Sequence, residues 1–150
     1  MKRILVVYPD KCKGCDRCKL ECSFFHFQEH NPSKAKIDVL PQNSSARSAV
    51  TICHQCGLCM AACPISGAIR RNRSTGAIVV NEEKCTGCGE CVVACPFGMI
   101  EIDPVTNIVS KCDLCGGSPR CVEGCKFGAL GYVNVQEAPF RKRSMWLRQH

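Results

Sequence analysis

The sequence has little of what a membrane, secreted or nucleic-acid-binding protein needs. No apolar run approaches the roughly 18 residues that a membrane-spanning helix requires. The apolar run at residues 4–8 is shorter than the seven to fifteen residues, roughly, of a secretion signal. Aromatic residues make up 6% of the 150 residues, too few for base-stacking surfaces. We therefore expect a cytoplasmic protein without a direct membrane span or a nucleic-acid partner.

Catalytic motifs and aliphatic packing are also scarce. No nucleophile with an adjacent base and no phosphate-binding loop is visible, so we expect a protein that is not itself an enzyme. The apolar share is 45%, but 16 residues are cysteine. Without cysteine the apolar share is about 34%, which is thin for a core. Something other than aliphatic packing must fill the interior.

The abundant feature is cysteine, arranged in four sets. The first three sets share the spacing C-x2-C-x2-C-x3-C, and the fourth widens its middle gap to five residues. The sets are Cys12, Cys15, Cys18, Cys22; Cys53, Cys56, Cys59, Cys63; Cys85, Cys88, Cys91, Cys95; and Cys112, Cys115, Cys121, Cys125. Disulfides are disfavoured in a cytosolic chain, and structural zinc normally takes two widely separated C-x2-C pairs.

Three closely spaced cysteines hold one cluster in two-cluster ferredoxins, and the fourth cysteine reaches the neighbouring cluster. The spacing therefore predicts four 4Fe-4S clusters held by all sixteen cysteines, with a zinc store as the alternative. The formal net charge of +7 counts every cysteine as neutral. Four oxidised clusters would bring it to about −1, so the basic residues are expected to be counter-ions.

Each set lies in a repeated unit of strand, cysteine loop, helical turn and strand. β-Branched runs precede three sets, in VVYPDKC, IVVNEEKC and NIVSKC, and a glycine followed by a β-prone run comes after the last cysteine of three sets. Polar turns at 74–76 and 104–107 predict hairpins. We expect an α+β fold: two nested ferredoxin-like modules with short antiparallel hairpins and short helices around four clusters.

The residue after the last cysteine of each set predicts how the sets pair. Pro64 and Pro96 follow the second and third sets, whereas Ser23 and Lys126 follow the first and fourth. We therefore expect an inner two-cluster module at 53–111, an outer module from 1–22 plus 112–135, a connecting segment at 23–52 and a basic tail at 136–150. The strand at 4–7 should then lie near that at 130–135. Sequential pairing, of set one with set two and set three with set four, is the alternative.

Nesting gives four ligand groups. They are Cys12/Cys15/Cys18/Cys125, Cys112/Cys115/Cys121/Cys22, Cys53/Cys56/Cys59/Cys95 and Cys85/Cys88/Cys91/Cys63. Since these groups already supply four thiols each, we expect the nearby histidines, His26, His30 and His54, to pack or hydrogen-bond rather than ligate.

Two apolar features lie outside the cysteine sets. The phenylalanines Phe24, Phe25 and Phe27 are expected to fill the core under the first set. The tail joins a basic run to Met145, Trp146 and Leu147, a composition typical of an anchor that docks on another subunit.

The sixteen cysteines, with the segment CSFFHFQEHNPSKAKIDV after the first set, give the chain a family resemblance. Over most of positions 3–135 it resembles the four-cluster iron-sulfur subunits of dimethyl sulfoxide reductase, formate dehydrogenase and formate hydrogenlyase. The resemblance implies nested ligation and a chain of clusters leading from a molybdenum or tungsten catalytic subunit to a membrane subunit, a flavin subunit or a soluble carrier.

The short fourth set and the compact chain look most like the small subunits of tungsten aldehyde oxidoreductases. We expect a subunit that relays single electrons between a large catalytic subunit, containing molybdenum or tungsten and oxidising aldehydes, and a flavin/NAD subunit or ferredoxin. The alternatives are a free soluble polyferredoxin and the electron-transfer partner of carbon monoxide dehydrogenase and hydrogenase. Copies of the chain could also associate with one another.

Overall fold

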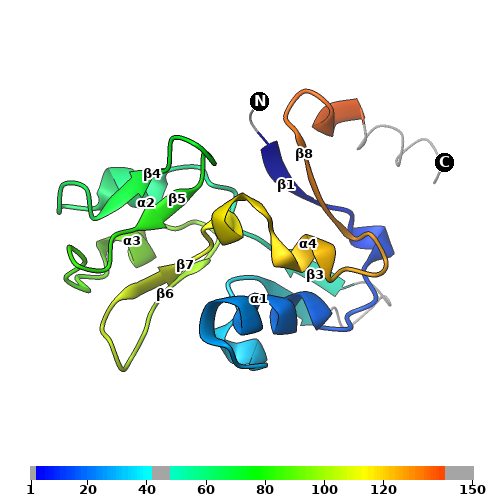
Figure 1. The fold of residues 1–150 in the computed structure, drawn as a ribbon, viewed down its shortest axis with the longest axis horizontal. Coiled ribbons are helices and arrows are strands. Elements are labelled where there is room, and N and C mark those ends of the chain that lie inside the picture. Colours follow the sequence, from blue (N-terminus) through cyan, green and yellow to red (C-terminus); the bar gives the residue numbers. More distant parts are fainter. Residues whose placement is uncertain (1–2, 42–47, 141–150) are drawn as a thin grey trace.

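The structure, a computed structural model, describes residues 3–41 and 48–140 (Figure 1). Its elements are β1 (Arg3–Val7), η1 (Pro9–Lys11), α1 (Arg17–Phe27), η2 (Pro32–Lys34), β2 (Asp38–Pro41), β3 (Ser48–Thr51), α2 (Leu58–Ala62), β4 (Ile69–Arg71), β5 (Ile78–Val80), α3 (Glu90–Val93), β6 (Ile100–Ile102), β7 (Val109–Lys111), η3 (Leu114–Gly117), α4 (Arg120–Glu123) and β8 (Leu130–Asn134). The described strands form four antiparallel pairs, β1–β8, β2–β3, β4–β5 and β6–β7. The fold is therefore mixed α+β, as expected.

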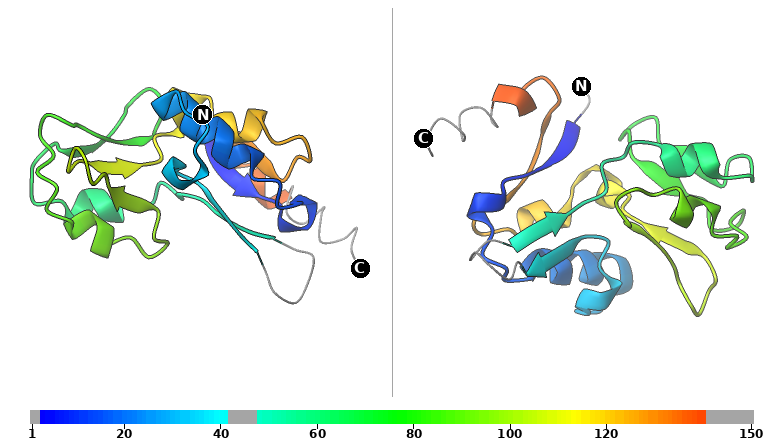
Figure 2. Two further views of the ribbon diagram at one scale, coloured as in Figure 1. Left: turned by 90° about the horizontal axis from the view of Figure 1, so that it is seen from below. Right: turned by 180° about the vertical axis from the view of Figure 1, so that it is seen from behind.

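One half of the molecule is built from both ends of the chain. Strand β1 pairs with β8 in the register Arg3↔Asn134 to Val7↔Leu130, which confirms the expected proximity of these two strands. Helix α1 packs against α4 on the same half, and Figure 2 shows the β2–β3 pair there too. Its core mixes aliphatic side chains such as Leu5, Ile37 and Leu130 with the sulfurs of Cys22 and Cys121.

The other half contains α2, α3 and the hairpins β4–β5 and β6–β7 (Figure 1). Both predicted hairpin turns are confirmed. In the first, the side chain of Asn72 accepts the N–H of Ser74, and in the second that of Asp103 accepts the N–H of Val105. Such Asx turns fix a tight reversal locally. Cys59 and Cys91 also pack into this half's small aliphatic core, so thiol groups contribute to both cores.

The helices of the first and second sets differ in length, and so does the residue after the last cysteine of each set. Helix α2 ends at Ala62, just before Cys63 and Pro64, whereas α1 continues through Ser23 to Phe27. Proline disfavours the α conformation in the residue before it, and serine does not. Ser23 is fully buried, and its hydroxyl donates to the Leu20 carbonyl at 3.0 Å. The serine therefore permits the eleven-residue helix α1.

The three phenylalanines of α1 were expected in the core, and that expectation is wrong. Phe24, Phe25 and Phe27 are 42%, 38% and 37% exposed, because Cys22 and Ser23 occupy the buried face of the helix. Their rings are covered by polar neighbours instead. Phe24 stacks on His30 at a centroid distance of 4.5 Å, and the other two rings lie beneath basic side chains.

The expected connecting segment contains a strand pair, β2–β3, that the sequence analysis did not anticipate. Residues 42–47 between these strands lie outside the described part of the chain. So do Met145, Trp146 and Leu147 of the basic tail. Among the described residues, no helix is long and apolar enough to cross a bilayer.

Candidate metal centres

Two cavities are each lined by four cysteines. The first contains Cys12, Cys15, Cys18 and Cys125. Cys12 precedes α1 and Cys125 follows α4, so the cavity joins residues from distant parts of the chain. The N–H of Tyr8 donates to the Ala129 carbonyl at 2.7 Å, which extends the β1–β8 pairing toward this cavity. The pairing of the first and last strands therefore brings these thiols together.

The second cavity lies in the other half of the molecule. It contains Cys53, Cys56, Cys59 and Cys95. The first three come from the loop and first turn of α2, and the fourth follows α3. Ile78 and Phe97 line the apolar wall, and Lys111 contributes the only ammonium group among the residues lining this cavity.

The thiols of the fourth set influence one another and Cys22. Burial raises the pKa of Cys121, and the charges of Cys112, Cys22 and Cys115 raise it further. Burial also raises the pKa of Cys22, with Cys115 among the charges that add to the effect. The structure therefore brings Cys22, from α1, among the cysteines of the fourth set.

The thiols of the third set meet the last cysteine of the second set. Burial raises the pKa of Cys91, and the charges of Cys63 and Cys85 add to this effect. Cys88, the remaining member of the third set, is exposed. The structure therefore brings Cys63 to Cys85 and Cys91.

In three cases the charge of a cysteine in one collection raises the pKa of a cysteine in another collection. The pairs are Cys18 with Cys121, Cys53 with Cys112 and Cys59 with Cys91. These pairwise charge effects connect the collections in the order first, fourth, second and third set, and we call this order the row. Cys15 and Cys88, at opposite ends of the row, are both exposed, and so is Cys56 of the second set.

Backbone N–H groups point at several cysteine sulfurs. The N–H of Met99 donates to Cys95 Sγ at 3.4 Å, and that of Ala129 donates to Cys125 Sγ at 3.3 Å. In both loops a glycine with positive φ precedes the donor, which turns the chain back toward the sulfur. Such donors stabilise negative charge on cysteines that ligate a metal.

The spacing of the thiols fits a multi-iron cluster better than a single zinc ion. Four sulfurs about 2.3 Å from one zinc ion would lie about 3.8 Å from each other. Within residues 3–41 and 48–140, no three thiol sulfurs all lie within 4.8 Å of one another. Together with the four cysteines that line each of the two cavities, this separation fits 4Fe-4S clusters.

Without a metal the buried thiols hold their protons at neutral pH. Burial raises the pKa of Cys18 and of Cys112 to about 12 in each case. Iron ligation requires the thiolate, so cluster assembly must displace these protons.

His26 lies beside the thiol of Cys115. Its Nε2 is 3.3 Å from Asp113 Oδ1 and 3.9 Å from Cys115 Sγ. Although burial disfavours the charged ring, hydrogen bonds with Asp113 and Cys115 raise the pKa of His26. Burial alone would raise the pKa of Asp113, but the bond to His26 lowers it to about 2. His26 therefore contacts Asp113 and Cys115, and the ligand atoms of these three side chains lie within 4.8 Å of one another, so whether His26 ligates a metal stays a prediction. His30 packs as predicted by stacking on Phe24.

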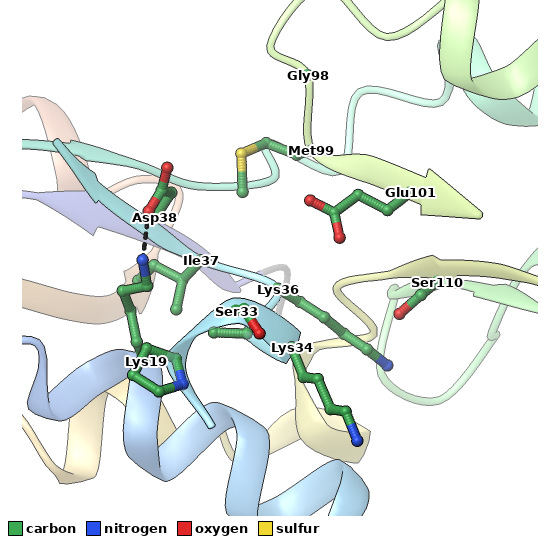
Figure 3. Close-up of a pocket in the computed structure, with 12 residues that line it drawn as sticks. Lys19, Ser33, Lys34, Lys36, Ile37, Asp38, Gly98, Met99, Glu101 and Ser110 are labelled. Carbon is green, nitrogen blue, oxygen red and sulfur yellow. Dashed lines mark hydrogen bonds and ion pairs between the residues drawn. The ribbon is translucent and has the colours of Figure 1, made fainter. Parts of the chain in front are cut away.

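A polar cleft lies between the connecting segment and hairpin β6–β7 (Figure 3). Three of the residues that line it are lysines, and each already has a partner. The pairs are Lys19 with Asp38 at 2.7 Å, Lys34 with Glu29 at 2.7 Å and Lys36 with the His26 ring at 3.3 Å. The cleft therefore offers no unpartnered lysine.

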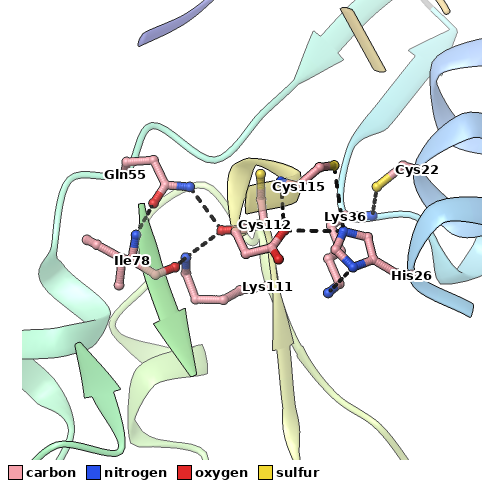
Figure 4. A network of polar contacts seen from close by, with 9 residues as sticks. Cys22, His26, Lys36, Gln55, Ile78, Lys111, Cys112 and Cys115 are labelled. Atoms are coloured by element: carbon pink, nitrogen blue, oxygen red, sulfur yellow. Dashed lines mark hydrogen bonds and ion pairs between the residues drawn. The ribbon is translucent and has the colours of Figure 1, made fainter. Parts of the chain in front are cut away.

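The sequence analysis missed a buried polar network between the two halves, which contains Gln55 and Lys111 (Figure 4). Lysine precedes the first cysteine of three sets, at positions 11, 84 and 111, but only Lys111 is buried. The repeated Lys-Cys dipeptide thus indicated a lysine beside the first cysteine of three sets. It does not distinguish a buried lysine from an exposed one.

Comparison with known families finds iron-sulfur domains along the chain. Residues 52–99 and 77–126 each match a 4Fe-4S dicluster domain, and residues 9–24 match a 4Fe-4S binding domain. The chain resembles BamBC of benzoyl coenzyme A reductase with a TM-score of 0.51 and 22% identity, covering 97% of this chain and 90% of that one. This structural likeness supports the fold alone.

Two relatives cover about three quarters of the chain. The aliphatic sulfonate oxidoreductase, polyferredoxin-like subunit of Pyrococcus furiosus is 42% identical over 114 residues, 75% of this chain and 65% of that protein. The Escherichia coli protein named "Putative electron transport protein YsaA" is 30% identical over 124 residues, 77% of each chain. The chain spans just under two thirds of the Pyrococcus relative and 19% of another relative, E. coli "Putative oxidoreductase AegA".

Proposed function

Because the chain belongs to the 4Fe-4S dicluster ferredoxin-like family, together with YsaA of E. coli, we propose that it relays electrons as a non-catalytic subunit of an oxidoreductase complex. The observation that carries this proposal is the pair of cavities lined by four cysteines each. When bound, a 4Fe-4S cluster takes up or releases one electron at a time. The chain supplies the thiol ligands, the burial and the surrounding charge.

We assign the sixteen cysteines to the four groups of the nested arrangement. The two cavities support Cys12/Cys15/Cys18/Cys125 and Cys53/Cys56/Cys59/Cys95. Mutual charge effects support Cys112/Cys115/Cys121/Cys22 and, for three of its members, Cys85/Cys88/Cys91/Cys63. In domain terms, an outer module of 1–22 plus 112–135 encloses an inner module of 53–111.

The row of groups gives the proposed electron path. Neighbouring groups are linked by cysteines close enough to affect one another's pKa, so an electron need never cross the molecule in one step. Of the three exposed cysteines, Cys15, Cys56 and Cys88, the first and the last belong to the two end groups. We assign electron entry and exit to these two positions.

The partner at one end is proposed to be a large catalytic oxidoreductase subunit. The name of the Pyrococcus relative, a subunit of an aliphatic sulfonate oxidoreductase, supports a subunit role. The family resemblance adds a tungsten or molybdenum centre on that partner and a flavin/NAD subunit or ferredoxin at the other end. Native anaerobic purification should yield a complex with a larger chain. Recovery of the tagged protein alone from its native host, with all its iron, would instead identify a free polyferredoxin.

Iron counts in double variants test the ligand groups. The intact protein should hold about 16 iron atoms, and loss of one cluster should leave about 12. Cys15→Ala with Cys125→Ala removes two ligands of one group, so about 12 iron atoms should remain. Cys115→Ala with Cys125→Ala removes ligands from two groups, so only about 8 should remain.

The matched pair also distinguishes the sequential alternative. There Cys125 would complete the group of Cys85, Cys88 and Cys91, so the variant lacking Cys15 and Cys125 would lose two clusters. Zinc in place of iron in anaerobically isolated protein would overturn the whole proposal.

A further inference from the structure

Lys111, the last residue of β7, is a buried lysine next to a cysteine of the fourth set. Its side chain points into the protein, and the residue is 3% exposed. The ammonium donates to the carbonyls of Ile78 and Cys112, both at 2.7 Å (Figure 4). Lys111 therefore bridges strand β5 of one half of the molecule to the fourth-set loop of the other.

The burial of this charge is not explained by an ion pair. Five described carboxylates form ion pairs, all of them with cations other than Lys111. Two carbonyl oxygens supply hydrogen bonds but no net negative charge. A buried ammonium is costly unless negative charge lies nearby, so the compensating charge must come from another source.

When bound, the clusters of two cysteine groups would supply that negative charge. Lys111 lines the cavity of Cys53, Cys56, Cys59 and Cys95, and it immediately precedes Cys112 of the neighbouring group. Its charge opposes the effect of burial on the pKa of Cys59 and of Cys112. A single ammonium therefore acts on the two groups in the middle of the row.

Gln55 holds this junction in place. Its Nε2 donates to the Cys112 carbonyl at 2.9 Å, and its Oε1 accepts the N–H of Ile78 at 2.8 Å (Figure 4). Gln55 and Lys111 thus both bind the backbone of Ile78 and Cys112. Two hydrogen bonds hold the ammonium, and two more from Gln55 hold the backbone to which it is bound.

On the basis of the proposed function, we propose that Lys111 is a positioning residue that raises the reduction potentials of the two middle clusters. A fixed positive charge stabilises the reduced form of a nearby cluster relative to its oxidised form, because the reduced form carries one more electron. Lys111 therefore makes both middle clusters better electron acceptors. The effect is strong because the ammonium is buried and little screened. It favours passage of the electron between the two halves of the protein.

The repeat offers a matched control for this charge. Lys84 also immediately precedes the first cysteine of a set, Cys85, but it is exposed. Lys111→Met removes the buried charge and keeps a side chain of similar length. Lys84→Met removes a charge at the equivalent position, where solvent screens it.

The readout is an anaerobic redox titration of the isolated protein with dithionite, followed by electron paramagnetic resonance. In Lys111→Met, the equilibrium constants for reduction of the two middle clusters should fall at least about tenfold. For a one-electron couple this corresponds to a reduction potential that is lower by about 59 mV. The other two clusters should change less, and Lys84→Met should leave the middle clusters unchanged. Potentials in Lys111→Met equal to those of the unmodified protein would overturn the inference.

A variant that retains the charge separates electrostatics from packing. Lys111→Arg keeps the positive charge, so it should retain the clusters and high middle potentials even if Lys111→Met loses iron. Equal loss of iron in both variants would show that Lys111 serves packing, and would overturn the inference. Absence of 4Fe-4S signals in the unmodified protein would instead refute the proposed function.

Discussion

Gly87, between Cys85 and Cys88, should be intolerant of alanine for two separable reasons. Its φ is +67°, which costs a residue with a side chain about 1–2 kcal/mol. A Cβ there would also lie 2.3 Å from the carbonyl oxygen of Asn107 and 2.5 Å from its side-chain nitrogen. Overpacking of this kind costs about 1–3 kcal/mol. Gly87→Ala should therefore lower the free energy of unfolding by about 2–5 kcal/mol.

Gly76, in the β4–β5 turn, provides the control. Its φ is +73°, but a Cβ would meet nothing within 4 Å. Gly76→Ala should therefore cost only the backbone strain, about 1–2 kcal/mol. Urea unfolding of both variants under anaerobic conditions, followed by circular dichroism, measures the difference. Because the clash lies in a cysteine loop, Gly87→Ala should also lose iron. Equal destabilisation by the two substitutions would refute the close approach of this loop to Asn107.

Three further predictions concern α1 and the clusters. Ser23→Ala removes a buried hydroxyl that accepts the N–H of Asn31 at 3.1 Å, so urea unfolding should show a loss of about 1 kcal/mol. The hydrogen bond from Lys19 to Asp38 raises the pKa of Lys19, so its stabilisation is complete below the ordinary lysine pKa and is lost as pH rises through the folded value. Asp38→Asn should therefore be less stable than the unmodified protein by at most about 1 kcal/mol at pH 8, and urea titrations should show this difference shrinking above about pH 10. Chelating the iron anaerobically should lower the midpoint of thermal unfolding, and an unchanged midpoint would contradict the role of the clusters in filling a thin core.

The sequence predicted the features that local chemistry determines. The cysteine spacing identified the sixteen candidate ligands, and the Asx turns at Asn72 and Asp103 were visible as polar breaks between β-prone runs. The β-prone runs on either side of the cysteine sets indicated that β1 and β8 would lie close together. The cysteine spacing and the turns depend on a few neighbouring residues.

Features that depend on tertiary contacts were not predictable in the same way. The phenylalanines of α1 were placed in the core because of their hydrophobicity, but the helix turns its cysteine face inward. The strand pair β2–β3 lies in the segment 23–52, which the sequence analysis assigned only as a connection between the modules. The burial of Lys111 arises from contacts with Ile78, which lies 33 residues away, in a network completed by Gln55.

The pairing of β1 with β8 has a consequence for how the chain is made. The ribosome delivers residues 53–111, with all eight cysteines of one half, before Cys125 and the strand that completes the other half. The first strand must therefore wait for the last one while the segment between them can already fold. A truncated nascent chain that stops before residue 130 would leave β1 without its partner strand.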